Sequence, residues 1–173
     1  MSKILITGGA GYLGSVLTPY LLSKKHKITV IDLMIYGEKV LKKHKNLKII
    51  KGDIRNVNLL NKVIHNHDII IHLACISNDS SFELNPKLGK SINLDTFEPL
   101  VKIAKNKGVK KFIYASSSSV YGIKNEKNVV EDMLLNPLTD YSRYKAECEK
   151  ILLKYKSDDF VTTIVRSATL CGY

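Results

Sequence analysis

The sequence predicts an α/β fold: a doubly wound parallel sheet with helices on both faces, in three layers (αβα). Short apolar runs alternate along the chain with segments of helical spacing, which is the order of a βαβ protein. Within most of these runs, apolar residues follow one another and do not alternate with polar ones, as expected of parallel strands buried on both faces. With 173 residues, the chain is long enough for one domain, so we expect residues 1–173 to form a single unit.

Each predicted element follows from its local pattern. Six apolar runs are the predicted strands, at residues 3–7, 27–32, 47–53, 68–74, 111–116 and 161–167. Four segments with apolar residues at helical spacing are the predicted helices, at residues 12–24, 57–66, 85–107 and 140–155. A glycine, Gly108, ends the third helix, and a polar loop is expected up to residue 139. Right-handed crossovers between these strands place helices on both faces of the sheet.

The composition narrows the class of protein. Net charge is +11, but all except three of the 27 basic residues are lysine, and they are spread along the chain. We interpret this as a solvated basic surface that attracts small anions, and not as a nucleic-acid site. No apolar run approaches the ~18 residues of a membrane span, and the N-terminus lacks a signal-peptide pattern, so we expect a cytoplasmic protein. Cys75, Cys148 and Cys171 lack metal-ligand spacing, which favours reduced thiols and no metal site.

A glycine-rich turn separates the first strand from the first helix. It reads TGGAGYLG over residues 7–14, with Gly8, Gly11 and Gly14 at GxxGxxG spacing. Such a turn lets the backbone approach a pyrophosphate at the positive end of a helix. Asp32 ends the second strand, where a carboxylate accepts hydrogen bonds from an adenosine ribose. It is followed by Leu33, without a nearby arginine for a 2′-phosphate, so the sequence favours NAD over NADP.

A tyrosine and a lysine lie one turn apart on the predicted helix at residues 140–155. Tyr141 and Lys145 therefore share a helix face. An isolated tyrosine, with a pKa of ~10, is a weak base near neutral pH. A nearby ammonium and an oxidised nicotinamide both favour the phenolate, and lowering the pKa by ~3 units takes ~4 kcal/mol. Alone, such a pair is typical of an exposed helix; its place after the dinucleotide turn favours catalysis.

Four consecutive serines, the first of which ends the fifth predicted strand, occur in ASSSSVYG at residues 115–122. The carboxyl end of this strand lies at the ligand-binding edge of a doubly wound sheet. Among other polar residues, His72 lies within an apolar strand and is predicted to be a core histidine. Arg166 ends the sixth strand, where it either faces the site or caps the sheet.

The motifs TGGAGYLG, GDIR, HLA, SSSSVYG and YSRYK, with Asp32, occur in an order that resembles the extended short-chain dehydrogenase/reductases. Within these, the chain is similar to the NAD-dependent epimerase/dehydratase family that acts on nucleotide-diphosphate sugars, over essentially all 173 residues. The resemblance implies a Rossmann fold and NAD as cofactor. It also implies these cofactor-binding residues: Gly8, Gly11, Tyr12, Leu13 and Gly14 at the pyrophosphate, Asp32 at the ribose, Asp53 and Ile54 at the adenine, Leu73 and Ala74 along the fourth strand, and Tyr141 and Lys145.

The resemblance further implies the chemistry. Tyr141 acts as acid/base, Lys145 binds the nicotinamide ribose, and Ser117, three residues before Val120, is the catalytic serine. The sugar transfers a hydride to NAD and receives it back. Dehydratases of the group carry acidic residues after the catalytic position. Here Ser118 and Ser119 follow, so an epimerase or a sugar dehydrogenase is favoured. As in relatives, Asn93 is expected to brace the fourth and fifth strands through a helix irregularity.

Full-length relatives continue past this point with a smaller C-terminal region that binds the nucleotide-sugar. We expect the chain to lack that substrate domain. Two hypotheses follow: a nucleotide-sugar epimerase-type enzyme that is completed elsewhere, or a truncated NAD-binding module with little or no turnover. A third hypothesis, a nucleic-acid-binding protein, is supported only by the net positive charge. Without that C-terminal region, apolar surface near the strand ends is expected to be exposed. Self-association into a homo-oligomer is therefore also expected.

Overall fold

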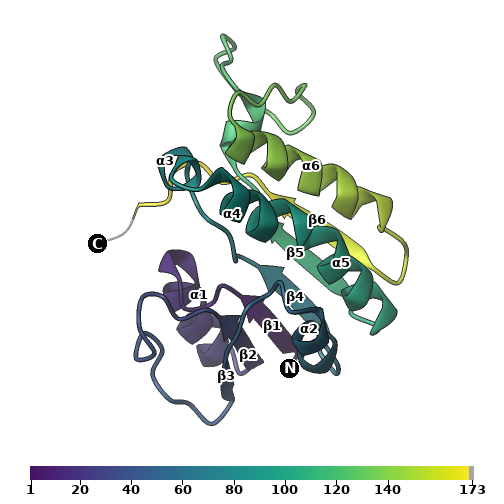
Figure 1. Cartoon of the computed structure of the whole chain (residues 1–173). Coiled ribbons are helices and arrows are strands. Elements are labelled where there is room, and N and C mark those ends of the chain that lie inside the picture. Colours follow the sequence, from purple (N-terminus) through teal and green to yellow (C-terminus); the bar gives the residue numbers. More distant parts are fainter. Residues whose placement is uncertain (172–173) are drawn as a thin grey trace.

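The computed structural model describes residues 1–171, and its core is one six-stranded parallel sheet (Figure 1). The strands lie in the order β3-β2-β1-β4-β5-β6. Their bounds are β1 Lys3–Thr7, β2 Lys27–Asp32, β3 Leu47–Lys51, β4 Ile69–His72, β5 Lys111–Ala115 and β6 Val161–Val165. The chain therefore starts in the middle of the sheet, winds to one edge, and then returns to fill the other side. This order confirms the predicted doubly wound fold.

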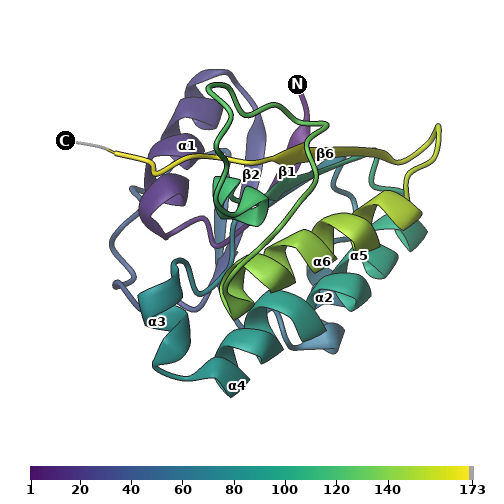
Figure 2. The ribbon, with the colours of Figure 1, turned by 90° about the horizontal axis from the view of Figure 1, so that it is seen from above.

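Helices lie on both faces of the sheet, as Figure 2 shows. On one face is α1, and the helices α2, α4, α5 and α6 lie on the other. The bounds are α1 Tyr12–Ser23, α2 Val57–Val63, α3 Asp79–Glu83, α4 Pro86–Lys90, α5 Phe97–Asn106 and α6 Asp140–Lys154. Two buried clusters result. The larger joins α2, α5 and α6 to the sheet around Phe97 and Phe112, and the smaller lies under α1 around Ile6 and Val30.

The segment predicted as one helix at residues 85–107 is divided in the structure. It consists of α4, a π-helical segment at Ser91–Asp95, and α5. The short helix α3 precedes it and was not predicted. In the loop after β5, Ser118–Tyr121 form one 3₁₀ turn. The other predicted elements are confirmed with ends that differ by up to three residues.

One predicted core residue, His72, is confirmed by its environment. Its ring is 3% exposed and stacks among aromatic side chains of β5 and α5. Its Nδ1 lies 2.7 Å from the Thr7 hydroxyl on the neighbouring strand β1. His72 therefore belongs to the packing between strands.

Acidification is expected to destabilise the fold through His72. Burial, helped by the charge of Lys145, lowers the pKa of His72 from 6.5 to about 3. The unfolded chain takes up a proton between these two pH values and the folded chain does not. The contribution of the neutral His72 to the free energy of unfolding is therefore fully present above the unfolded pKa of 6.5. It is lost progressively as the pH falls from 6.5 toward 3. At pH 5 the loss is about 2 kcal/mol, measurable by urea unfolding at pH 7.5 and pH 5.

The control is His72→Gln, which keeps a polar side chain beside Thr7 but does not titrate. Between pH 7.5 and pH 5, the free energy of unfolding of this variant should fall by about 2 kcal/mol less than that of the wild-type chain. Burial also lowers the pKa of His67, and that contribution remains in the variant. An identical pH dependence in the two proteins would contradict the assignment to His72.

The face of the sheet that carries α1 is open over β5 and β6. Along β6, Val161 and Val165 point away from α6, and each is 45% exposed. Their neighbours in register on β5 are Lys111 and Ala115. Two valines on a sheet face are normally covered by another layer. The predicted exposure of apolar surface is thus present in the structure.

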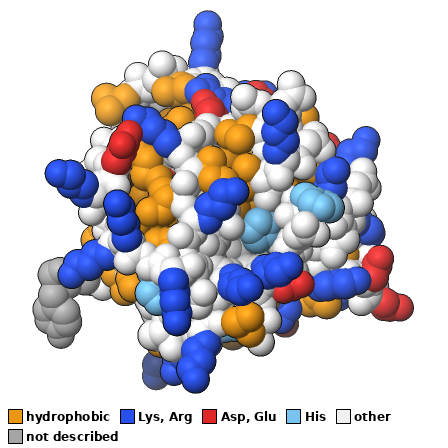
Figure 3. Space-filling model, turned by 90° about the horizontal axis from the view of Figure 1, so that it is seen from below, with side chains coloured by type: hydrophobic (Ala, Val, Ile, Leu, Met, Phe, Trp, Pro, Cys, Tyr) orange, Lys and Arg blue, Asp and Glu red, His pale blue; other side chains and the backbone are white. Residues whose placement is uncertain are grey.

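The basic residues are dispersed over the face of the molecule that Figure 3 shows. Figure 3 shows lysine and arginine side chains scattered among apolar and neutral ones over one face of the molecule. Within residues 1–171, no helix has the length and apolarity to cross a membrane. The same residues contain no group of three or more His, Cys, Asp or Glu side chains placed to hold a metal ion.

Candidate cofactor and catalytic site

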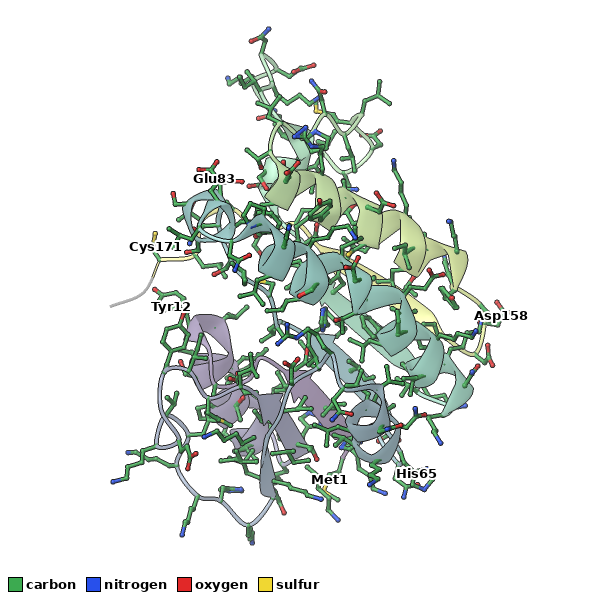
Figure 4. All side chains as sticks on the ribbon, viewed as in Figure 1. Met1, Tyr12, His65, Glu83, Asp158 and Cys171 are labelled. Carbon is green, nitrogen blue, oxygen red and sulfur yellow. The ribbon has the colours of Figure 1, made fainter. Side chains whose placement is uncertain are left out.

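The predicted site residues gather where the strands end. Figure 4 shows Tyr12, Glu83 and Cys171 toward this end of the molecule and Met1, His65 and Asp158 toward the opposite one. The turn after β1, the segment after β4 and the serine loop after β5 all leave the sheet here because the strands are parallel. In a doubly wound sheet this edge forms a crevice where the strand order reverses, between β1 and β4.

The turn after β1 is packed so tightly that two of its glycines cannot be replaced. Gly8 has φ +73°, and a Cβ there would lie 2.6 Å from the Cα and N of Ala74. A Cβ on Gly14 would lie 2.5 Å from the backbone of Gly9. Gly8 therefore brings the turn against the end of β4, and Gly14 lets α1 begin directly over the turn. Both features are those of a pyrophosphate-binding turn.

The start of α1 leaves its backbone donors free for an anion. Its N-cap, Gly11, provides no side-chain hydrogen bond, and the first turn contains no acidic residue. Tyr12 and Leu13 lie in this first turn with exposed side chains. Uncapped N–H groups and the helix dipole together favour a phosphate group.

Asp32, at the end of β2, is held facing the turn. Its Oδ2 accepts a hydrogen bond from Ala10 N at 2.9 Å, and its Oδ1 accepts one from Met34 N at 2.8 Å. Each carboxylate oxygen has a second lone pair available for a ligand. The geometry places a fixed acceptor pair next to the glycine-rich turn, as the ribose role requires.

Asp53 and Ile54 are placed differently from each other. The carboxylate of Asp53 is already paired with Arg55, whose Nε lies 2.9 Å from Oδ2, and this hydrogen bonding lowers the pKa of Asp53. Ile54 is 5% exposed in the larger core cluster, so its side chain is not available to a ligand. Any adenine contact at Ile54 must use its backbone.

Leu73 and Ala74 leave β4 beside the glycine-rich turn. Both are half-buried, and Leu73 N donates a hydrogen bond to Thr7 O at 3.0 Å. Leu73 packs against the cluster under α1, and Ala74 packs against the cluster on the opposite face. They therefore form the floor between the two halves of the sheet.

Tyr141 and Lys145 are both buried on the inner face of α6. Lys145 is 4% exposed, and its Nζ donates a hydrogen bond to Ala115 O at 2.7 Å, at the end of β5. The ammonium also lies 5.7 Å from the ring centroid of Tyr141 and 5.0 Å from that of Tyr114. A buried ammonium fixed beside a tyrosine ring is the arrangement that supports a tyrosine base.

In the chain by itself, the pKa of Tyr141 lies above its usual value because burial opposes the phenolate. Four neighbours also act on this pKa: Lys145, the Ser117 hydroxyl and the Asn78 backbone lower it, and Cys75 raises it. The lysine alone is therefore not enough to make Tyr141 a base near neutral pH. A base at this position would need a further positive charge, such as that of the oxidised nicotinamide expected from the sequence.

The four serines have four different environments. Ser116 is buried and donates to Glu149, and Ser118 is exposed. Ser117 Oγ accepts hydrogen bonds from Ser119 N at 3.2 Å and from Ser119 Oγ at 2.8 Å. Ser117 is also the serine whose hydroxyl influences Tyr141. This geometry favours Ser117 over its neighbours, with Ser119 orienting it.

The irregular helix expected around Asn93 is present. Asn93 Oδ1 accepts from Ile76 N at 2.8 Å, and Asn93 Nδ2 donates to Ile76 O at 2.9 Å. Asn93 lies within the π-helical segment, and these two bonds tie it to the chain after β4. Its own carbonyl oxygen accepts from the Cys148 thiol of α6 at 3.2 Å. These hydrogen bonds thus join the end of β4 to α6, and not, as predicted, the fourth strand to the fifth.

One residue at this edge, Glu149, had no assigned role in the sequence, and Asn78, in the loop after the fourth strand, was a candidate only for contact with the substrate. Glu149 lies four residues after Lys145, so helical spacing alone places it on the inner face of α6. Asn78 has φ +79° and caps α3 by accepting from Ser81 N at 2.8 Å. Nothing in the local sequence pattern indicates that the Asn78 backbone approaches Tyr141.

A family model described as the NAD dependent epimerase/dehydratase family matches residues 4–173. A dTDP-D-glucose 4,6-dehydratase of Dictyostelium discoideum is 35% identical, over 99% of this chain and 44% of that protein. Among solved structures, the UDP-Glc/GlcNAc 4-epimerase from Campylobacter jejuni superimposes with a TM-score of 0.89 at 29% identity, covering 96% of this chain and 53% of that one. The Bordetella bronchiseptica enzyme WbmG, in complex with NAD, superimposes with a TM-score of 0.82 at 27% identity, covering 95% and 52%. The chain spans about half the length of these relatives.

Proposed function

Because the chain belongs to the NAD-dependent epimerase/dehydratase family, we propose that it carries the cofactor-binding and catalytic part of a nucleotide-sugar epimerase-type oxidoreductase. The observation that carries the proposal is the close approach of Gly8 to Ala74, next to an uncapped helix N-terminus and Asp32. A side chain at Gly8 would fill this cradle. The residues present therefore fit a dinucleotide.

We assign the cofactor contacts as follows. The backbone of the glycine-rich turn holds the pyrophosphate, Asp32 the adenosine ribose, and Lys145 the nicotinamide ribose. Further contacts come from the remaining members of the proposed cofactor site, which are Tyr12, Leu13, Asp53, the backbone of Ile54, Leu73, Ala74 and Tyr141. When bound, NAD supplies a reversible hydride acceptor for the sugar.

The protein groups supply the proton transfer. Tyr141 removes the proton from a sugar hydroxyl, and the neighbouring charge of Lys145 stabilises the phenolate that starts the step. Ser117 donates a hydrogen bond to the same sugar oxygen and holds it in line with Tyr141. Return of the proton from Tyr141 completes the cycle. The serines at positions 118 and 119 favour an epimerase or dehydrogenase over a dehydratase.

The substrate is a nucleotide-diphosphate sugar, for which the basic surface provides long-range attraction. We place the protein in the cytoplasm, in keeping with the free thiols of Cys75, Cys148 and Cys171. Self-association through the open face of β6 is the further expectation for the chain on its own, and light scattering tests it.

A second candidate is an NAD-binding module with little or no turnover. It is favoured by the length of the match, because the chain spans only about half of its relatives. Calorimetric titration of the chain with NAD tests both candidates, and both predict binding. Addition of a UDP-sugar to the NAD-loaded chain then separates them: a change in NADH absorbance or an epimerised product supports the enzyme. Absence of NAD binding would refute both.

Ser117→Ala is expected to leave NAD binding unchanged and to lower sugar oxidation by about 10²–10⁴-fold, in this chain or in a longer polypeptide that contains it. The reason is that Ser117 contacts the reacting oxygen and not the cofactor. The measurement pairs NAD calorimetry with sugar-dependent NADH formation.

The matched control is Ser119→Ala, which removes the neighbour that hydrogen-bonds Ser117. Its effect should be much smaller, because the Ser117 hydroxyl is retained. If Ser119→Ala abolished the reaction and Ser117→Ala did not, the assignment of the catalytic serine would be wrong by two positions.

A further inference from the structure

A buried ion pair lies directly under the serine loop. Glu149 of α6 is 2% exposed, and its Oε1 accepts a hydrogen bond from the Ser116 hydroxyl. Arg166, just after β6, donates to the same carboxylate, from Nη2 to Oε2 at 2.8 Å and from Nε to Oε1 at 3.1 Å. A carboxylate that accepts hydrogen bonds from a bidentate guanidinium and from a hydroxyl is rigidly oriented.

The other end of Arg166 holds the segment that follows the serines. Its Nη1 donates to Tyr121 Oη at 2.8 Å and to Glu131 O at 2.9 Å. The guanidinium also lies over the Tyr121 ring, 4.9 Å from its centroid. Arg166 therefore connects α6, the turn after the serines and the loop beyond it.

Two side chains on the inner face of α6 contact consecutive residues at the end of β5. Lys145 binds the carbonyl of Ala115, and Glu149 binds the hydroxyl of Ser116. Tyr141 is the next residue along this face, and the residue that follows Ser116 is Ser117. The pair Glu149–Arg166 thus fixes the residue directly before the candidate catalytic serine.

Stability alone is a weak reason for such a pair. The cost of desolvating two charges is large, and well-packed apolar residues in their place are often as stable or more so. What apolar residues do not provide is a directed contact to Ser116 and Tyr121. The pair therefore suits an orienting role.

We propose that Glu149 and Arg166 form a positioning pair that holds the Ser117 hydroxyl in reach of Tyr141. This inference rests on the proposed function, in which Ser117 and Tyr141 act on the same sugar oxygen. Neither Glu149 nor Arg166 touches the substrate or cofactor; they act through Ser116 and Tyr121.

The test follows the ionisation of Tyr141 in the chain without cofactor. Tyrosines are replaced by 3-fluorotyrosine, whose fluorine moves ionisation to milder pH, and fluorine NMR follows each ring, with Tyr141→Phe assigning the signal. In Glu149→Gln, Arg166 keeps its charge but loses its counter-charge, and the serine loop shifts. Movement of the Ser117 hydroxyl away from Tyr141 should raise the pKa of Tyr141, because this hydroxyl lowers it. The double variant described below removes both charges and therefore shows the rise without the opposite effect of an unpaired Arg166 charge.

Two further variants separate positioning from folding. Glu147→Gln, on the exposed side of the same helix, should change neither the pKa of Tyr141 nor the melting temperature. Glu149→Gln should lower the melting temperature by several degrees, because it leaves the partly buried cation of Arg166 without its counter-charge. The double variant Glu149→Leu/Arg166→Met removes both charges and should recover most of that loss while the pKa of Tyr141 stays high.

A wild-type pKa of Tyr141 in the double variant would overturn the proposal and leave the pair a purely structural one. The titration of Tyr141 does not require NAD. Failure of the chain to bind NAD in calorimetry would therefore refute the proposed function without affecting the test of the positioning pair. Retained NAD binding in Glu149→Gln, together with the raised pKa, would support positioning of Ser117 in particular.

Discussion

Replacing Gly8 by alanine is expected to weaken NAD binding at least about a hundredfold, equivalent to about 2.7 kcal/mol. Two costs act together at this position. The φ of +73° is unfavourable for any L-residue with a Cβ, by about 1–2 kcal/mol. The new Cβ would also lie 2.6 Å from the Ala74 backbone, which no side-chain rotation can relieve. The turn must move away from β4, and its N–H groups move with it.

A second glycine separates these two costs. Gly108 has φ +77°, nearly that of Gly8, but a Cβ there meets nothing within 4 Å. Gly108→Ala should therefore lose about 1–2 kcal/mol of stability by urea unfolding and bind NAD normally. Equal NAD affinities for Gly8→Ala and wild type would show that the turn does not hold the cofactor.

Gly8 also illustrates which features of the fold could be predicted from the sequence and which could not. The strands were predictable because each is a short, mostly apolar run, and Gly8 stood out because the glycines follow such a run. The reason why Gly8 tolerates no side chain was not predictable. It depends on Ala74, which lies 66 positions away and reaches Gly8 only because β4 pairs with β1.

The misjudged helix at residues 85–107 has a similar cause. Its apolar spacing is helical throughout, and the interruption comes from the two hydrogen bonds between Asn93 and Ile76. These link residues in separate elements, so local propensity carries no signal for them. The short α3 was missed because its start depends on Asn78, in a left-handed conformation that non-glycine residues rarely adopt.

In the site, helical spacing was sufficient to pair Tyr141 with Lys145 but not to give the direction of the Tyr141 pKa. The positive neighbours of Tyr141 lower its pKa, but burial, which raises it, is the largest influence in the folded chain. Burial of a side chain depends on every element packed around it. The orientation of Ser117 likewise depends on Glu149 and Arg166, whose contact joins α6 to β6.

Tyr141→Phe is expected to remove the sugar chemistry, by about 10²–10⁴-fold or more in the rate of sugar-dependent NADH formation, while the fold is retained. Phenylalanine fills the same volume on the inner face of α6 but has no hydroxyl to accept the proton. The matched control is Tyr144→Phe, three residues further along. Tyr144 packs edge-on against Phe82, 5.6 Å between ring centroids, on another side of the helix. That variant should retain the wild-type rate.

The role of Lys145 can be read from the pH dependence of the same reaction. Its charge lowers the pKa of Tyr141 and opposes the effect of burial, so Lys145→Met should move that pKa further upward. Since the phenolate is the base, the rising limb of the rate profile must shift to higher pH, and the rate near neutral pH must fall. A lower rate with an unshifted profile would mean that Lys145 serves only to bind the cofactor. An unchanged rate in Tyr141→Phe would remove Tyr141 from the mechanism altogether.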